Sequence, residues 1–575
     1  MEGVRHRLGD DAASVPRIVL PITSRGLPVT DRLCWGVLAA AMAAAAALML
    51  YLNRGTTFFV DELIWVYDSP DTGVGDLLDP YNGNLIAVTR LAYKAILETI
   101  GPEYLAFRLL GVAALLLSSG FLYALARRRI GSLPALAPAI VLLFLGSAWQ
   151  YVVVPLGFSA LFSIAAGLAA LLVLERGDRR GDVAACALVV LSVATFSTGL
   201  LFCVGVAISV FLRPDRWRRA WIFLVPLVLY GAWWLSVMDS VQDPGAQAKL
   251  PNALLIPGYA ADSLAAAVGA LVGLDFSFTV PQPQHQVELG WGRVLAAVAV
   301  IALVARIGRG NVRTSLWASL GILVTFFVLG GLAFSEIRPP ALGRYTLIGA
   351  VGVLLVAIDA ARGVTFSKLG LIALFAVATV SLATNLALLR DGAASFREGY
   401  TRPVRATFTM LELARAHVRP DFNPRAALAN PPPHPMPVPP YDYLQAADRY
   451  GSLGYSLAEL ARQSEVVRGG ADQVLAKALD LELGGTRTDP PAKECRALPS
   501  QEGTVELPPG GATLRLSSGD PAPVTLGRFA DTPTIGVGNL APGEPTMLQI
   551  PMDASSEPWR TAVAATGPVE ICALR

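Results

Sequence analysis

Runs of about twenty apolar residues recur along the first two-thirds of this chain. The first run extends from Leu33 to Leu52, and others lie near 106–126, 134–151, 156–174, 183–197, 199–212, 219–238, 290–306, 314–334, 342–360 and 367–389. A helix needs about 20 such residues to cross bilayer hydrocarbon, where the backbone finds hydrogen-bond partners only inside a helix or closed barrel. The sequence therefore predicts an α-helical polytopic membrane protein with about 11 transmembrane helices. The pair 183–197 and 199–212 is either two short helices or one long bent helix.

The composition agrees with this class. Charged residues make up 16% of the chain and hydrophobic residues 54%, and the mean hydropathy is +0.52. Soluble domains carry about a quarter charged residues. The formal net charge of +2 gives no indication of nucleic-acid binding, and the excess of Arg over Lys favours a bacterial source.

Positive charge predicts the orientation. The first apolar run ends in Tyr51-Leu52-Asn53-Arg54 rather than in a small-residue cleavage site, which favours an uncleaved anchor. Arg and Lys cluster in the N-terminal tail and in alternate loops, at 127–129, 176–180, 213–219, 306–313 and 362–368. The positive-inside rule makes that side cytoplasmic. We therefore expect a cell-membrane protein with a cytoplasmic tail at 1–32, a transmembrane domain at 33–390, and extracytoplasmic loops at 54–105 and 239–289.

Everything after the last apolar run is then extracytoplasmic. Residues 391–494 mix helical stretches with a proline-rich linker at 431–435, and residues 495–575 alternate in short runs between Gly/Pro turns, as in a small β-sandwich. Cys495 and Cys572 bracket this β-rich part on the oxidising side, which favours a disulfide over two free thiols. The other three cysteines lie in apolar runs and are interpreted as packing residues.

Several kinds of site are absent from the sequence. It contains no Walker A motif, no glycine-rich dinucleotide fingerprint, no G-x-S-x-G elbow and no Cys/His spacing typical of zinc. No metal ligand and no cofactor are predicted, and a requirement for a divalent metal ion stays open. His285 is interpreted as an ordinary loop residue. Asp68, Asp71 and Asp79 could bind an acceptor or a metal, but each is equally typical of a turn.

The first extracytoplasmic loop holds the most distinctive residues. Asp61 and Glu62 are adjacent carboxylates directly after the first span, flanked by aromatic residues. Such carboxylates are costly to desolvate unless they are used or paired, although Asp61 is equally well explained as the cap of a short helix. Residues 85–100 follow with one charged stripe, which predicts an amphipathic helix on the membrane surface. The next span carries Arg108 near its start.

This arrangement resembles the GT-C glycosyltransferases, which include the protein O-mannosyltransferases and the aminoarabinose and arabinofuranosyl transferases. The resemblance rests on one anchor, a loop opening with Asp-Glu, surface helices, a return span with Arg108, many short spans and a C-terminal extracytoplasmic domain. It implies an inverting hexosyl- or pentosyltransferase that passes a sugar from a polyprenyl-phosphate carrier to a cell-envelope glycan or protein at the outer face of the lipid bilayer. It also implies that Asp61, with Glu62 beside it, supplies the general base.

A base for the acceptor hydroxyl and cations for the phosphate would suffice for this chemistry. The turn before the run 342–360 offers Arg338 and Arg344, against the positive-inside trend, and Arg forks match phosphate oxygens. Relatives often carry an Arg-Tyr pair in a comparable loop, which favours Arg344 with Tyr345. We also assign Asn84 and Arg108 to substrate binding. The alternative for Arg338 and Arg344 is contact with lipid headgroups or with Glu336.

Two other functions remain open. A transporter or flippase for a lipid-linked glycan would need charged groups at mid-membrane and repeated halves. A catalytically inactive GT-C-like scaffold that binds glycan through its β-rich tail fits one departure from the family, since many relatives have a His-Pro-Pro-like stretch where this chain has Asn82-Gly83-Asn84-Leu85.

Overall fold

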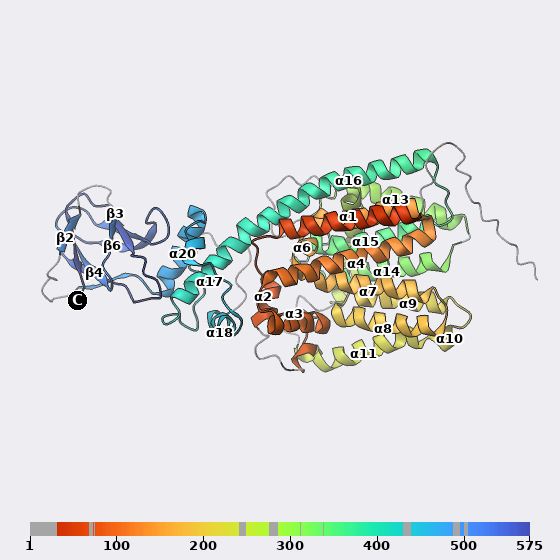
Figure 1. Cartoon of the computed structure of the whole chain (residues 1–575), viewed down its shortest axis with the longest axis horizontal. Helices are drawn as coiled ribbons and strands as arrows, with labels where there is room; N and C mark the ends of the chain where they lie inside the picture. Colours follow the sequence, from red (N-terminus) through yellow and green to blue (C-terminus); the bar gives the residue numbers. More distant parts are fainter. Residues whose placement is uncertain are drawn as a thin grey trace, which may run out of the picture.

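The computed structural model describes residues 31–67, 73, 75–240, 249–274, 286–310, 312–336, 338–428, 439–486, 495–498 and 504–574. Predictions for residues 1–30, Asp68, Asp71, His285 and the proline-rich stretch 431–435 fall outside these ranges. Figure 1 shows an elongated molecule with a helical bundle at one end and a β-rich part, which carries the C-terminus, at the other.

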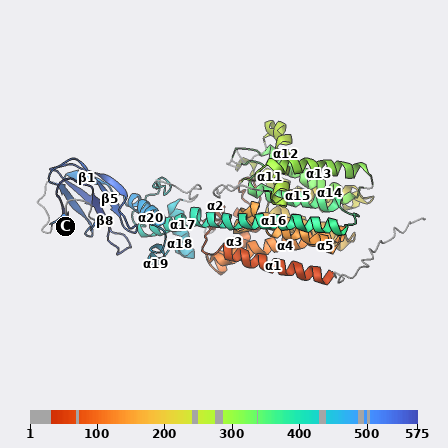
Figure 2. The ribbon, with the colours of Figure 1, turned by 90° about the horizontal axis from the view of Figure 1, so that it is seen from above.

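The bundle consists of apolar helices that lie side by side (Figures 1 and 2). They are α1 (Asp31–Leu52), α4 (Tyr104–Ile130), α5 (Ser132–Leu143), α7 (Phe158–Leu174), α8 (Arg179–Thr195), α9 (Gly199–Phe211), α11 (Trp221–Val237), α13 (Gly290–Gly308), α14 (Thr314–Leu332), α15 (Gly343–Ala360) and α16 (Lys368–Ser395). Within the described ranges, nine helical stretches are long and apolar enough to cross a membrane, and α9 and α11 are shorter apolar helices. The protein is a multi-pass membrane protein; the count of about 11 spans stays a prediction. The stretch 183–212 forms two helices.

One apolar helix lies inside the predicted loop 239–289. After the short η5 (Leu250–Leu255), α12 (Ile256–Val272) packs with Ile256 against Gly331 at the end of α14. Its Ala265 contacts Gly292 at the start of α13, and its Ala270 carbonyl accepts a hydrogen bond from Asn385 Nδ2 at 3.0 Å. These contacts place both ends of α12 near one end of the bundle.

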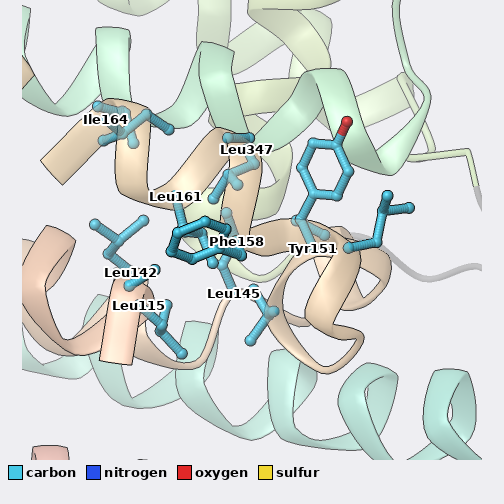
Figure 3. Packing of buried hydrophobic residues seen from close by; sticks show 14 of the residues in the cluster. Leu115, Leu142, Leu145, Tyr151, Phe158, Leu161, Ile164 and Leu347 are labelled. Atoms are coloured by element: carbon cyan, nitrogen blue, oxygen red, sulfur yellow. The ribbon is translucent and has the colours of Figure 1, made fainter. Parts of the chain in front are cut away.

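The chain between α5 and α7 is broken. It consists of η2 (Gly146–Ala148), α6 (Trp149–Val152) and η3 (Pro155–Gly157). Gly146 allows the break to pack against α16, because a Cβ there would lie 1.9 Å from the Asn385 carbonyl oxygen. Asn385 Oδ1 in turn accepts a hydrogen bond from the Ser147 backbone N–H at 3.1 Å. Such breaks are tolerated at membrane depth where the surrounding protein satisfies the backbone. Figure 3 shows the apolar packing around it, with the Tyr151 hydroxyl pointing away from Phe158.

The first predicted extracytoplasmic loop folds against the end of the bundle at which α12 lies. This end is called here the α2 end. The loop holds α2 (Val60–Tyr67), η1 (Asp76–Leu78) and α3 (Ala87–Thr99). In α3, Thr89, Tyr93 and Leu97 are buried while Leu91 is exposed. The helix predicted at 85–100 is therefore present as α3, and its position on the membrane surface stays a prediction.

The last bundle helix continues out of the bundle. α16 passes through a π-helical segment (Phe396–Thr401) into α17 (Arg402–Leu413), so that one helical stretch of 46 residues links the bundle to the C-terminal part (Figure 2). Three further helices follow it: α18 (Pro440–Tyr450), α19 (Leu457–Leu460) and α20 (Glu465–Ala478).

The C-terminal strands form two antiparallel sheets, ordered β1-β7-β4-β9-β2 and β3-β8-β5-β6. The strands are β1 (Leu483–Thr486), β2 (Cys495–Leu498), β3 (Thr504–Glu506), β4 (Gly511–Leu516), β5 (Ala522–Gly527), β6 (Ile535–Leu540), β7 (Pro545–Gln549), β8 (Arg560–Val563) and β9 (Val569–Ala573). Leu514 and Leu548 of the first sheet share an apolar core with Val524 and Leu526 of the second, as in a small sandwich. The β structure begins at Leu483, earlier than the predicted boundary at 495, because β1 pairs with β7.

Cys495 and Cys572 form a disulfide between the neighbouring strands β2 and β9. Replacing both cysteines by Ser is expected to destabilise the sandwich by about 3–4 kcal/mol, because the bond closes a long loop in the unfolded chain, with a sequence separation of 77. Thermal unfolding with and without a reducing agent measures the effect. Reductant should lower the wild-type midpoint and leave the double variant unchanged; equal midpoints for both proteins would contradict the prediction.

Candidate active site

A cavity of about 420 Å³ lies at the α2 end of the bundle. Its lining comes from α2, the turn before α3, the segment from α6 to the start of α7, the α8–α9 connection and the start of α9, α11, α12, the end of α14, and the turn and first residues of α15. Among the described residues that line it, the charged ones are Asp61, Arg338 and Arg344. The structure thus brings together one acidic and two basic residues that the sequence singled out.

Asp61 reaches the cavity from the first turn of α2. The helix begins at Val60, and Glu62 Oε2 accepts a hydrogen bond from the Phe59 backbone N–H at 2.8 Å, which satisfies one of the free donors at the helix start. Glu62, rather than Asp61, therefore caps the helix. The Asp61 side chain is left to accept a hydrogen bond from the Tyr81 hydroxyl at 2.9 Å.

Tyr81 is held by a tight two-residue turn. Its backbone N–H and carbonyl exchange hydrogen bonds of 3.0 and 2.9 Å with Asn84. Between them Asn82 and Gly83 have φ angles of 48° and 74°, the left-handed conformations that an Asn-Gly hairpin turn requires. Asn84 Nδ2 also donates to the Asn82 carbonyl at 3.1 Å. Asn84 lines the cavity as expected, but its amide group holds the turn together.

Burial raises the pKa of Asp61 above its ordinary value of 3.8. The Tyr81 hydrogen bond and the charges of Arg344 and Arg338 act in the opposite direction and lower that pKa. A carboxylate with a raised pKa is a better proton acceptor near neutral pH, provided that it remains ionised. The neighbouring arginines favour the ionised form, so the arrangement suits a general base.

The two arginines form the cationic side of the cavity. Arg344 follows the first residue of α15, and its guanidinium lies 5.1 Å from the ring centre of Tyr345, which also lines the cavity. The Arg344 Nε atom is buried and has no hydrogen-bond partner among the described residues. A buried N–H without a partner costs about 1–3 kcal/mol, so this donor is suited to an anionic ligand.

The remaining lining is largely apolar and aromatic. It includes Trp65, Leu156, Phe196, Leu200, Leu201, Tyr230, Trp234, Tyr259, Phe326, Leu329 and Ile348. One cavity therefore offers a carboxylate, two guanidinium groups and hydrocarbon-like walls, which fits an amphiphile with an anionic head.

Glu62 does not line the cavity. Its carboxylate is buried and accepts hydrogen bonds from Tyr93 at 2.5 Å and Tyr104 at 3.1 Å, in addition to the Phe59 N–H. Burial raises its pKa to about 7. The geometry favours a structural role, tying α2 to α3 and α4, over the catalytic role expected from the sequence. Adjacent helical residues point about 100° apart, so Asp61 and Glu62 cannot face the same way.

Glu62→Ala is expected to destabilise the protein by about 3 kcal/mol, because it leaves buried hydroxyl and N–H donors without an acceptor. Thermal unfolding in detergent measures the loss.

The contribution of Glu62 to stability also depends on pH. Its pKa is about 7 in the folded protein and ordinarily 4.5, so the folded state binds the proton more tightly. The resulting stabilisation is complete below pH 4.5 and is lost as the pH rises through 7. Glu62→Gln, which does not titrate, should lack this fall; an unchanged fall would assign it to another group.

Arg108 also lies outside the cavity lining. Its guanidinium donates to the Asn53 carbonyl at the end of α1, at 3.1 Å, and lies 6.0 Å from the ring centre of Tyr104. The substrate-binding role expected for Arg108 finds no support in this position, since the side chain joins α4 to α1 instead.

Sequence reasoning missed Tyr81 and the aromatic walls. Tyr81 lies directly before the Asn-Gly pair, which is the strongest short-range indication of a hairpin turn, so its fixed position could have been inferred. Tyr230 and Trp234 lie in an apolar helix where nothing in the sequence distinguishes a cavity wall from lipid contact. Across the described ranges, no group of three or more His, Cys, Asp or Glu side chains is placed to hold a metal ion.

No protein-family model and no curated protein sequence matches the chain. Among solved structures it is similar to ArnT from Cupriavidus metallidurans in the apo state, with 16% identity, 68% of this chain and 82% of that chain covered, and a TM-score of 0.44. ArnT bound to undecaprenyl phosphate gives the same identity and coverage, with a TM-score of 0.42. The archaeal oligosaccharyltransferase AglB from Archaeoglobus fulgidus, in complex with an inhibitory peptide and a dolichol-phosphate, gives 12% identity, 77% and 68% coverage, and a TM-score of 0.39.

Proposed function

We propose that this protein is a membrane glycosyltransferase that transfers a sugar from a polyprenyl-phosphate carrier to a cell-envelope acceptor. The observation that carries the proposal is the single cavity in which Asp61, Arg338 and Arg344 meet an apolar wall. Each part matches one need of the reaction: a base, a phosphate site and a surface for the lipid chain.

The acceptor hydroxyl attacks the anomeric carbon of the donor sugar, and its proton passes to Asp61. The bond between that carbon and the phosphate oxygen breaks, and polyprenyl phosphate leaves with the electron pair. Arg344 and Arg338 stabilise the negative charge on the leaving phosphate, which then needs little protonation. Attack opposite to the leaving group inverts the anomeric configuration.

We also propose that the α2 end faces the outside of the cell. Arg127, Arg128 and Arg129 lie in the last turn of α4, at its end away from α2, and the start of α1 lies at that same far end, where Asp31 pairs with Arg127 (Figure 1). The positive-inside rule assigns that end to the cytoplasm. The cavity and the β-sandwich then share the extracytoplasmic side.

Transfer assays in membranes that express the protein test the proposal. Radiolabelled polyprenyl-phosphate hexoses and pentoses are offered as donors, with the matching nucleotide sugars as controls. We expect label to enter an extracted envelope glycan or protein only from a lipid donor. Absence of transfer from every lipid donor, together with label crossing the bilayer on its carrier, would replace this proposal by a flippase.

A further inference from the structure

Helices from the C-terminal part enclose both ends of α2. The ring of Phe59, directly before the helix, lies 5.6 Å from that of Phe396 and 5.0 Å from that of Tyr400, both in the π-helical segment after α16. At the other end of α2, the ring of Tyr67 lies 5.8 Å from that of Tyr443 in α18. The helix that presents Asp61 is therefore packed against residues more than 300 positions away in the sequence.

Tyr443 is itself held from several sides. It is completely buried, and its ring stacks on that of Phe408 in α17, with the centres 4.2 Å apart and the planes 10° from parallel. Its hydroxyl donates to Glu412 and accepts a hydrogen bond from the Leu453 backbone N–H at 3.3 Å. These contacts fix the surface on which Tyr67 rests.

α18 is also fastened to α3. Arg449 forms an ion pair of 2.8 Å with Glu98, and the Tyr450 hydroxyl donates to the same carboxylate at 3.3 Å. Glu62 ties α2 to Tyr93 of α3. Together α2, α3, α17 and α18 form one packed unit beside the cavity.

A helix of eight residues cannot hold its shape or direction alone, because its few hydrogen bonds do not offset the cost of nucleation. The direction in which α2 points Asp61 must therefore come from its packing. We propose that Tyr443 is a positioning residue of the active site and that α17 and α18 act as a clamp that keeps Asp61 facing the cavity. This inference rests on the proposed function only in taking Asp61 as the group that acts on the acceptor.

Hydrogen–deuterium exchange on the full-length protein tests the clamp without any substrate. In Tyr443→Ala, amide exchange in peptides covering 58–67 should accelerate by about 100-fold or more, while peptides from α4 and α14 keep their wild-type exchange. Tyr441→Ala is the matched control, because Tyr441 lies on the same helix with 68% of its surface exposed. Unchanged exchange in 58–67 overturns the clamp, even if the enzyme transfers sugar.

Kinetics test the consequence for catalysis. Tyr443→Ala should lower kcat on the order of 100-fold, as a displacement of about 1 Å does elsewhere, and leave the donor KM within about two-fold, because the arginines lie on other elements. Tyr443→Phe keeps the ring and should recover most of the rate. A KM that rises as much as kcat falls would indicate general disorder of the cavity and overturn the positioning role.

The two proposals fail in distinguishable ways. A wild type that transfers no sugar removes the proposed function, and exchange alone then decides the clamp. If Tyr443→Ala does not reach the membrane folded, Phe408→Leu takes its place, since it removes only the ring stacked on Tyr443, and the same exchange and kinetic results are expected.

Discussion

Asp61→Asn is expected to reduce sugar transfer by about 1,000-fold, the scale at which a positioned general base contributes. Asn keeps the shape of the side chain and its hydrogen bond with Tyr81 but cannot take a proton from the acceptor. Transfer from the radiolabelled lipid donor, normalised to the amount of folded protein, measures the loss. The donor KM should change little, because the residues proposed to hold the phosphate are Arg338 and Arg344.

The wild-type rate should rise with pH as Asp61 ionises. Burial raises the pKa of Asp61, so the acidic limb of the kcat profile should lie above pH 3.8. Asp262→Asn is the matched control: Asp262 of α12 pairs with Arg293 of α13, outside the cavity lining, and its replacement should leave the rate unchanged. If Asp61→Asn transferred as well as wild type, the carboxylate would have no part in the chemistry and the mechanism proposed here would be wrong.

Arg344→Gln is expected to lower kcat/KM for the lipid donor by roughly 100-fold, as loss of one partner of a buried charge contact does. The loss should appear in both the donor KM and kcat, because the phosphate gains charge as it leaves. Arg344→Lys should recover only part of it, since Lys keeps the charge but lacks the planar fork. Arg54→Gln, at an exposed position just after α1, is the control.

Arg344→Gln should also shift the pH dependence of kcat. The charge of Arg344 lowers the pKa of Asp61, so its removal raises that pKa and moves the acidic limb of the kcat profile to higher pH. Arg54→Gln should leave the limb in place. An unmoved limb in Arg344→Gln, together with an unchanged donor KM, would exclude Arg344 from the site.

The sequence predicts those elements that are determined by their own hydrophobic pattern. The run 33–52 is apolar throughout and forms α1, and the alternating stretches near 512 and 546 form β4 and β7. The π-helical segment 396–401 was not predicted, nor was the course of α12 across one end of the bundle. Both depend on contacts with distant elements. Phe59 packs on the π-helical segment, and Asn385 donates a hydrogen bond to the Ala270 carbonyl of α12.

The candidate site likewise combines residues that the sequence singles out with positions that depend on tertiary contacts. Asp61, Arg338 and Arg344 stand out because charge is rare near membrane spans, and the cavity brings them together. Sequence alone could not tell that Asp61 faces the cavity while Glu62 and Arg108 lie outside its lining, because that depends on the rotational phase of a helix. For α2 this phase depends on contacts with distant parts of the chain, such as the ring of Tyr93 beside Trp65 and the ring of Tyr443 beside Tyr67.

The continuous helix from α16 through α17 sets the distance between the α2 end of the bundle and the C-terminal part. Tyr400 lies beside Phe59 at the level of α2, and Leu413 comes 13 residues later. At about 1.5 Å per residue, that interval corresponds to roughly 20 Å. Beyond this point Asp472 of α20 accepts hydrogen bonds from the backbone N–H groups of Arg528 and Ala530, which joins α20 to the sandwich. A chain molecule held at the sandwich would reach the cavity only if it were several sugar units long, which sets a minimum length for any polymer that occupies both places at once.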